Sequence, residues 1–161
     1  MVRLGIGIGI GIALSFFSVS LFNQWQTFRT AILFSEYDIL QGIGTLVEDL
    51  FEFDIINFFS VGPYTITNFF QPAFLACLLM GFVSGAISGG LKRGFIAGTL
   101  VIIISLLIWI CLSIFSGQDL IALFQGAQLL DTIGGILGAL SGGVLGGIAG
   151  GSATSPTYSK E

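Results

Sequence analysis

Hydrophobic positions gather into four long stretches along the chain, separated by more polar segments. The four stretches cover about residues 4–22, 72–90, 95–115 and 133–151. A helix needs about 20 predominantly apolar residues to cross the hydrocarbon core of a bilayer, and each stretch reaches or approaches that length. Backbone polar groups inside a bilayer must be hydrogen-bonded within the segment, so each stretch is expected to be helical. The pattern predicts an all-α integral membrane protein with four transmembrane helices in one domain, residues 1–161.

The first stretch opens with glycine and isoleucine in strict alternation, from Gly5 to Ile12. Alternation is typical of a strand, but a lone strand would leave its backbone edges unsatisfied in a bilayer, so a helix is the better prediction. A basic flank at Arg3 and small residues at Ser18 and Ser20 also allow a secretory signal. Because the apolar run is long for a signal, we expect a retained anchor.

The longest segment between two stretches, residues 23–71, has a different period. Its apolar residues recur at alternating steps of four and three, with polar and acidic residues between them. The apolar set is Ile39, Ile43, Leu46, Leu50 and Phe53. This spacing predicts an amphipathic extracytoplasmic helix that lies along the membrane surface or caps the bundle. Its polar face is acidic, whereas helices that bind anionic lipid are rich in lysine and arginine, so we expect it to pack on protein or zwitterionic lipid.

Glycine dominates the last stretch, which holds no charged residue between Ile133 and Gly151. One row of glycines steps by four through Gly134, Gly138, Gly142, Gly146 and Gly150. A parallel row runs through Gly135, Ala139, Gly143, Gly147 and Gly151, and the stretch 72–90 carries Gly81, Gly85 and Gly89. Small residues at this spacing allow two helix backbones to approach closely in a bilayer. The rows predict glycine-zipper packing, in which the small residues of one helix face the backbone of another, within the chain or with a partner subunit.

Residues 81–98 combine a glycine-spaced helix, a Gly-Gly-Leu-Lys-Arg-Gly turn and a second glycine-spaced helix. This stretch resembles a glycine-rich helical hairpin found in small archaeal integral membrane proteins of unknown function. The resemblance implies an archaeal-type inner bundle and no known activity.

Basic residues predict the orientation of the bundle, because lysine and arginine are enriched on cytoplasmic flanks. With four crossings, both termini lie on one side. That side receives Arg3, Lys92, Arg93 and Lys160, whereas the other side receives only Arg29. We therefore expect a multi-pass protein of the cell membrane with both termini in the cytoplasm.

Composition agrees with the membrane class and removes several chemistries. The chain is 9% charged, whereas soluble domains carry about 25% charged residues. It lacks histidine, the commonest general base and metal ligand. Five basic residues and a net charge of −4 argue against binding to nucleic acid. Two cysteines, Cys77 and Cys111, are too few for a metal site of their own and are expected to be buried thiols.

Neither a catalytic constellation nor a cofactor or metal motif is evident. The acidic cluster Glu48, Asp49, Glu52 and Asp54 lacks the spacing of a calcium loop, so a solvated helix face is expected. We therefore expect a non-enzymatic structural or accessory component of a membrane assembly, in contact with lipid and with itself or another membrane protein. The alternative is a small homo-oligomeric channel or transporter for an uncharged solute, with serine hydroxyls along its path.

Overall fold

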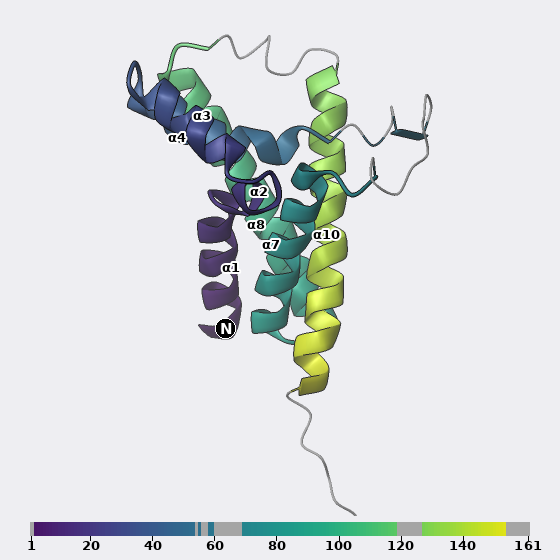
Figure 1. Cartoon of the computed structure of the whole chain (residues 1–161). Helices are drawn as coiled ribbons and strands as arrows, with labels where there is room; N and C mark the ends of the chain where they lie inside the picture. The colour runs from purple at the N-terminus through teal and green to yellow at the C-terminus, as the bar shows by residue number, and fades with distance from the viewer. Residues whose placement is uncertain (1, 54, 56–57, 60–68, 119–126, 154–161) are drawn as a thin grey trace, which may run out of the picture.

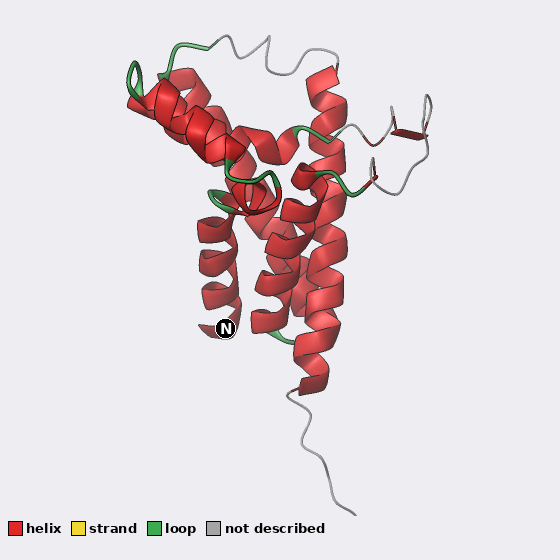
Figure 2. Cartoon of the chain, in the orientation of Figure 1, coloured by secondary structure: helices red, strands yellow, loops and turns green. Residues whose placement is uncertain are grey.

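The computed structural model describes residues 2–53, 55, 58–59, 69–118 and 127–153, and all regular elements in these ranges are helical (Figure 2). The elements are α1 (Val2–Ser15), α2 (Ser18–Phe22), α3 (Gln26–Ser35), α4 (Ile39–Glu48), the 3-10 turn η1 (Asp49–Phe51), α7 (Pro72–Ser88), α8 (Leu91–Phe115) and α10 (Ala127–Ala153). The prediction of an all-α fold is therefore confirmed. Much of the predicted segment 23–71 is described, but Asp54, residues 56–57 and residues 60–68 lie outside these ranges.

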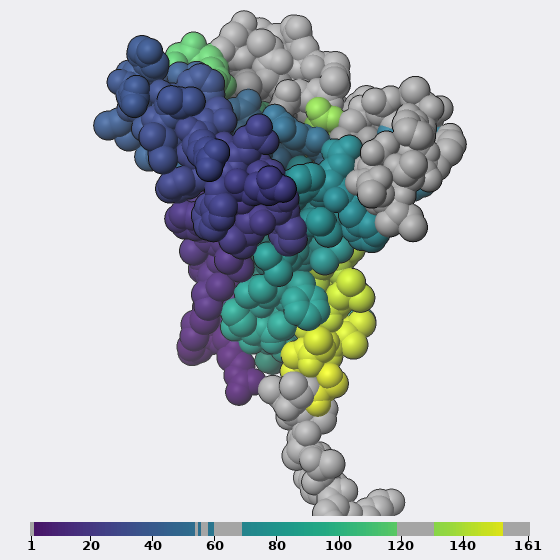
Figure 3. Space-filling view, in the orientation of Figure 1, coloured from purple at the N-terminus to yellow at the C-terminus, as the bar shows by residue number. Residues whose placement is uncertain are grey.

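Helices α7, α8 and α10 form the centre of the molecule. α10 packs most extensively on α7 and also on α8, and α1 lies against α7 and α8 (Figure 1). α3 and α4 pair as a hairpin at the end of the bundle opposite the N-terminus, and α4 also packs on α8. The space-filling view shows the molecule widening at the hairpin end (Figure 3).

Within the described residues, two of the four predicted spans are long and apolar enough to cross a membrane, one in α8 and one at Asp131–Ser152 of α10. α1 has 14 residues and α7 has 17. At a rise of about 1.5 Å per residue they extend about 21 and 25 Å, against about 30 Å of hydrocarbon. α1 is short because the first apolar stretch turns at residues 16–17 before α2 begins.

The α7–α8 connection is a tight glycine turn. α7 begins at Pro72, where the missing N–H group would have had no helical partner. Its other end passes through Gly89 and Gly90, whose φ angles of 64° and 93° suit residues without a Cβ. The Gly90 N–H donates to the Gly147 carbonyl at 2.8 Å, which fastens this turn to α10.

The predicted amphipathic helix is present, but the prediction that all of its apolar residues face the protein is partly wrong. Leu50 and Phe53 are fully buried, whereas Ile39 is 67% exposed and Ile43 is 38% exposed. Hydrophobic spacing shows which side of a helix is apolar, but a neighbouring helix can dock on another side if small residues allow it. Here α4 turns Gly44 towards α8, where a Cβ on this glycine would lie 3.7 Å from the Leu112 side chain.

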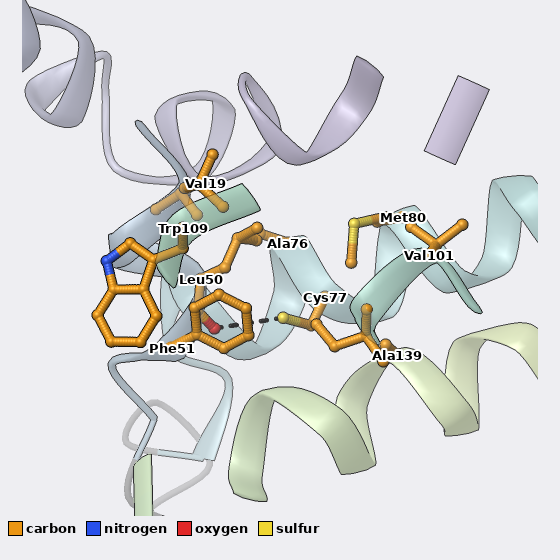
Figure 4. Packing of buried hydrophobic residues seen from close by; sticks show 11 residues of the cluster. Val19, Leu50, Phe51, Ala76, Cys77, Met80, Val101, Trp109 and Ala139 are labelled. Carbon is orange, nitrogen blue, oxygen red and sulfur yellow. Dashed lines mark hydrogen bonds between the residues drawn. The ribbon is translucent and has the colours of Figure 1, made fainter. Parts of the chain in front are cut away.

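The main core lies where the hairpin meets the bundle. It joins the chain around η1 to α7 and α8, and its largest fully buried side chain is Trp109. The Trp109 ring packs on Phe51 with 5.5 Å between ring centroids. Nearby, the Cys77 thiol donates to the Leu50 carbonyl at 3.3 Å (Figure 4). Cys77 is a buried free thiol as expected, but the same expectation is wrong for Cys111, which is exposed on α8.

Candidate functional site at the glycine surfaces of α10

One glycine row of α10 faces the backbone of α7. At three successive glycines, a Cβ atom would come closer than 3.0 Å to an α7 carbonyl oxygen, a separation that real Cβ atoms do not show. The pairs are Gly142 with Leu78, Gly146 with Phe82, and Gly150 with Ala86. Each missing Cβ leaves a Cα–H bond pointing towards a carbonyl, an arrangement that recurs at close helix–helix interfaces. The steps of four on both helices keep the two backbones in register.

The first two glycines of this row have different neighbours. At Gly134 a Cβ would collide with the Phe53 carbonyl, which belongs to the segment after η1. At Gly138 it would lie 3.1 Å from the Cys77 Cβ and 3.2 Å from the Phe74 ring. The row therefore contacts the α7 backbone only over its C-terminal part.

The parallel row of α10 faces α8 and the turn residue Gly90 before it, except at Gly135, where a Cβ would lie 2.9 Å from the Leu50 carbonyl oxygen of η1. A Cβ on Gly143 would lie 2.6 Å from the Gly94 carbonyl oxygen, and a Cβ on Gly147 would lie 2.8 Å from that of Gly90. The contact is reciprocal, because a Cβ on Gly98 would lie 2.7 Å from the Ala139 carbonyl oxygen. Gly94 and Gly98 were not among the packing residues predicted from the sequence, although their spacing of four indicates a close helix contact.

The α7 glycines named from the sequence do not share one role. Gly81 and Gly85 lie against the carbonyls of Ala139 and Gly143, with too little space for a Cβ. Gly89 has its nearest such neighbour, the Gly150 oxygen, at 3.8 Å. Gly89 therefore serves the turn through its positive φ angle rather than the helix interface.

Helix α1 uses only one of its two glycine pairs. A Cβ on Gly7 would lie 2.6 Å from the Ser84 carbonyl oxygen, and one on Gly11 would lie 2.6 Å from the Val101 side chain. Gly5 and Gly9 have nothing within 4 Å. The alternation of glycine and isoleucine therefore places one pair against the bundle and the other on the outer surface.

The basic residues that predict topology gather at one end. Arg3 near the start of α1 is exposed, as are Lys92 and Arg93 at the start of α8. Figure 1 shows the N-terminus, the α7–α8 turn and the C-terminal end of α10 at this same end. Lys160 lies outside the described residues.

An acidic pocket lies near the hairpin end. Its volume is about 130 Å³, and its lining includes Asn23, Asp49 and Glu52. The Thr27 hydroxyl donates to the Asp49 carboxylate, and the Asn23 amide donates to the Thr27 hydroxyl. The described residues contain no group of three or more acidic, cysteine or histidine side chains placed to hold a metal ion.

Burial raises the pKa of the pocket carboxyl groups of Asp49 and Glu52 and of the neighbouring Glu48. For Glu48 the pKa rises through desolvation and then through the charge of Asp49. For Asp49 the pKa rises through desolvation, partly offset by the Thr27 hydrogen bond. The pKa of Glu52 rises through desolvation and the charges of Asp49, Glu48 and Asp131. The expectation of a freely solvated acidic face is therefore wrong for Glu48 and Asp49, which are only partly exposed.

These raised pKa values predict that alkaline pH destabilises the fold. The pKa of such a carboxyl group is higher in the folded chain than in the unfolded chain. Its contribution to stability is fully present when the pH lies below its ordinary pKa of about 4. That contribution is lost as the pH rises through the raised pKa. We expect a lower thermal unfolding midpoint in detergent at about pH 8 than at about pH 4.5, and a smaller difference in Glu52→Gln. The exposed hairpin residue Glu36 provides the control. If Glu36→Gln reduced the difference in unfolding midpoint as much as Glu52→Gln does, the buried carboxyl groups would not be its cause.

Hydroxyl groups on the long helices are mostly bonded to their own backbone. The Ser84 hydroxyl donates to the Gly81 carbonyl at 2.9 Å, and the Ser88 hydroxyl donates to the Ser84 carbonyl at 2.8 Å. On α10, the Ser141 hydroxyl donates to the Leu137 carbonyl at 2.8 Å. Such local bonds satisfy a hydroxyl in an apolar setting without requiring a polar path.

Comparisons with protein-family models, curated protein sequences and solved structures give no match for this chain. Its function is therefore inferred from the packing surfaces, the charges and the exposed side chains described above.

Proposed function

We propose that this chain is a multi-pass membrane protein without catalytic activity that acts as a structural or accessory component of a membrane assembly. The observation that carries this proposal is the distribution of side-chain size around α10. Its glycines face the neighbouring helices, whereas its large side chains Leu137, Leu145 and Ile148 are 42%, 52% and 51% exposed. Contiguous apolar surface of this kind is rare on soluble monomers but suits contact with lipid or with another membrane protein.

In such a protein the glycine rows stabilise the packing of the helices on one another. Lipid chains are as apolar as leucine, so helices in a bilayer associate through close van der Waals packing rather than hydrophobic burial. The contacts of α10 with α7 and α8 fit a glycine zipper that holds three helices of one chain together. Because both rows are occupied within the chain, contacts with a second copy or another membrane protein would use the bulky outer surfaces.

The proposed topology has four crossings with both termini in the cytoplasm. Its support is the gathering of Arg3, Lys92 and Arg93 at one end of the bundle, since cytoplasmic flanks are enriched in basic residues. The short helices α1 and α7 cross together with the longer α8 and α10. The acidic pocket and the α3–α4 hairpin then lie on the external side.

The channel alternative would need a row of polar groups along a path. In the part of the chain that the structure describes, the buried serine hydroxyls without a hydrogen-bond partner are those of Ser18, Ser20 and Ser105. The hydroxyls of Ser84, Ser88 and Ser141 donate to carbonyls of their own helices, so they are not held in place to bind a solute. The structural or accessory role is therefore the one we retain.

Native mass spectrometry of the full chain, released from mild detergent, tests this role. We expect a species larger than one chain, or one chain with a co-purifying membrane protein. Retained lipid alone would support the membrane location but not an assembly role. A strictly monomeric species without a protein partner, across several mild detergents, would contradict the assembly role.

A further inference from the structure

The α3–α4 hairpin exposes an apolar face although neither helix is long enough to span a bilayer. Ile32 is 50% exposed, Ile39 is 67% exposed and Trp25, just before α3, is 50% exposed. An open groove of about 140 Å³ lies between the two helices, and its lining includes Phe28, Ile32, Ile39 and Ile43. Ile32 and Ile39 therefore belong to one apolar surface rather than to scattered contacts.

This face points away from the bundle because the opposite side of the hairpin is already occupied. The two helices meet closely at Gly42, where a Cβ would lie 2.6 Å from the Ala31 carbonyl oxygen. On α4, Val47 is fully buried and Gly44 lies against Leu112 of α8. The hairpin cannot cover its exposed face by rotating without breaking these contacts.

The exposed face carries little charge. α3 and α4 each contain one charged residue, Arg29 and Glu48. Glu48 follows Ile39 by nine positions, which places it on the opposite side of an α-helix with about 100° per residue. The acidic residues Glu36 and Asp38 lie at the tip of the hairpin, where the Asp38 carboxylate caps α4 by accepting from the Leu40 N–H at 2.9 Å.

Apolar side chains are also exposed on α8 at this end of the bundle. α4 packs on α8 through Gly44 and Leu112, and the other side of α8 exposes Leu107 at 53% and Ile114 at 50%. Interfacial helices bury an apolar side about 5–10 Å into the boundary between headgroups and acyl chains. Tryptophan favours this depth, and Trp25 stands at the base of the hairpin.

From these observations we infer that the α3–α4 face is inserted into the external leaflet, with lipid acyl chains filling the groove between Phe28 and Ile43. The inference rests on the proposed membrane location. The acidic tip favours zwitterionic over anionic headgroups, because like charges repel. In this arrangement the hairpin widens the protein in one leaflet only and fills the depth that the short helix α1 leaves uncovered.

Spin labels on single cysteines test the depth of the hairpin. Cys111→Ser removes the exposed thiol, and the fully buried Cys77 stays in place. Ile32→Cys reports on the hairpin face, Leu107→Cys on the outer surface of α8 and Lys92→Cys on the aqueous flank. The full chain is reconstituted in phosphatidylcholine vesicles, and power-saturation EPR compares collisions with oxygen, which concentrates in lipid, and with a water-soluble nickel chelate.

We expect the Ile32 label to resemble the Leu107 label, with oxygen collisions exceeding nickel collisions severalfold. An Ile32 label that resembles Lys92, while Leu107 stays in lipid, would overturn the hairpin inference and leave the membrane proposal standing. Low accessibility to both reagents would show that a protein partner or second copy covers the face, which also overturns the inference. Nickel access at all three positions would contradict the membrane proposal itself.

Discussion

Adding a single methyl group at Gly146 should separate α10 from α7. In Gly146→Ala the new Cβ would collide with the Phe82 carbonyl oxygen and lie 2.9 Å from the Ala86 nitrogen. Both are helix backbone atoms, so no side-chain rotation relieves the collision. Overpacking costs typically about 1–3 kcal/mol and occasionally more, and the close Cα–H···O contacts that hold the pair are lost as well. We expect the free energy of unfolding, measured by SDS titration in micelles, to fall by at least about 2 kcal/mol.

Two matched variants separate this effect from a general response to mutation. Gly9→Ala adds the same methyl group on α1, where nothing lies within 4 Å, and should be neutral or stabilising because alanine favours the helix. Ile103→Leu changes a side chain that is 46% exposed on α8 and should be tolerated. Gly142→Leu and Gly146→Leu should be more damaging than Gly146→Ala. If all these variants were equally stable, the glycine rows would not be packing surfaces.

The second large effect is expected from Trp109→Ala. Trp109 is the largest fully buried side chain of the described core, and it packs on Phe51 where the hairpin meets the bundle. Removing a buried aromatic side chain typically costs about 3–5 kcal/mol because the cavity collapses only partly. The same SDS titration should show this loss, and limited proteolysis should cut the chain near the hairpin sooner than in the parent protein.

Leu107→Ala is the control for this cavity, because Leu107 lies on the same helix but is 53% exposed. It should lose much less stability, since its side chain leaves no enclosed cavity behind. Equal losses in Trp109→Ala and Leu107→Ala would mean that the contact between Trp109 and Phe51 is not what joins the hairpin to the bundle.

The long helices α7, α8 and α10 could be predicted with little ambiguity from the apolar stretches. The glycine turn at Gly89 and Gly90 marked the end of α7 correctly, because glycine acts through local backbone geometry. The break after Ser15 was missed, since residues 4–22 are apolar on both sides of it and hydrophobicity alone does not report a turn. α3 was missed for the opposite reason, because its exposed apolar residues do not alternate with a polar face.

The acidic pocket could be predicted only in part. Glu48, Asp49 and Glu52 stood out as a cluster, but their partners Thr27, Asn23 and Asp131 come from other parts of the chain. Sequence spacing along one helix cannot show such partners. The partial burial that raises the pKa values arises only when η1 packs between α7 and α10.

Apolar length and low charge were sufficient, without a structure, to predict a helical chain. The four-residue glycine rows likewise showed that close helix contacts were possible. Only the tertiary structure decided which neighbour each row meets: Gly146 meets α7, Gly143 meets α8, and Gly9 meets nothing. A row of small residues has the same spacing whichever surface it faces. Because lipid-facing and protein-facing positions are both apolar here, hydrophobic periodicity could not distinguish them, and packing had to do so.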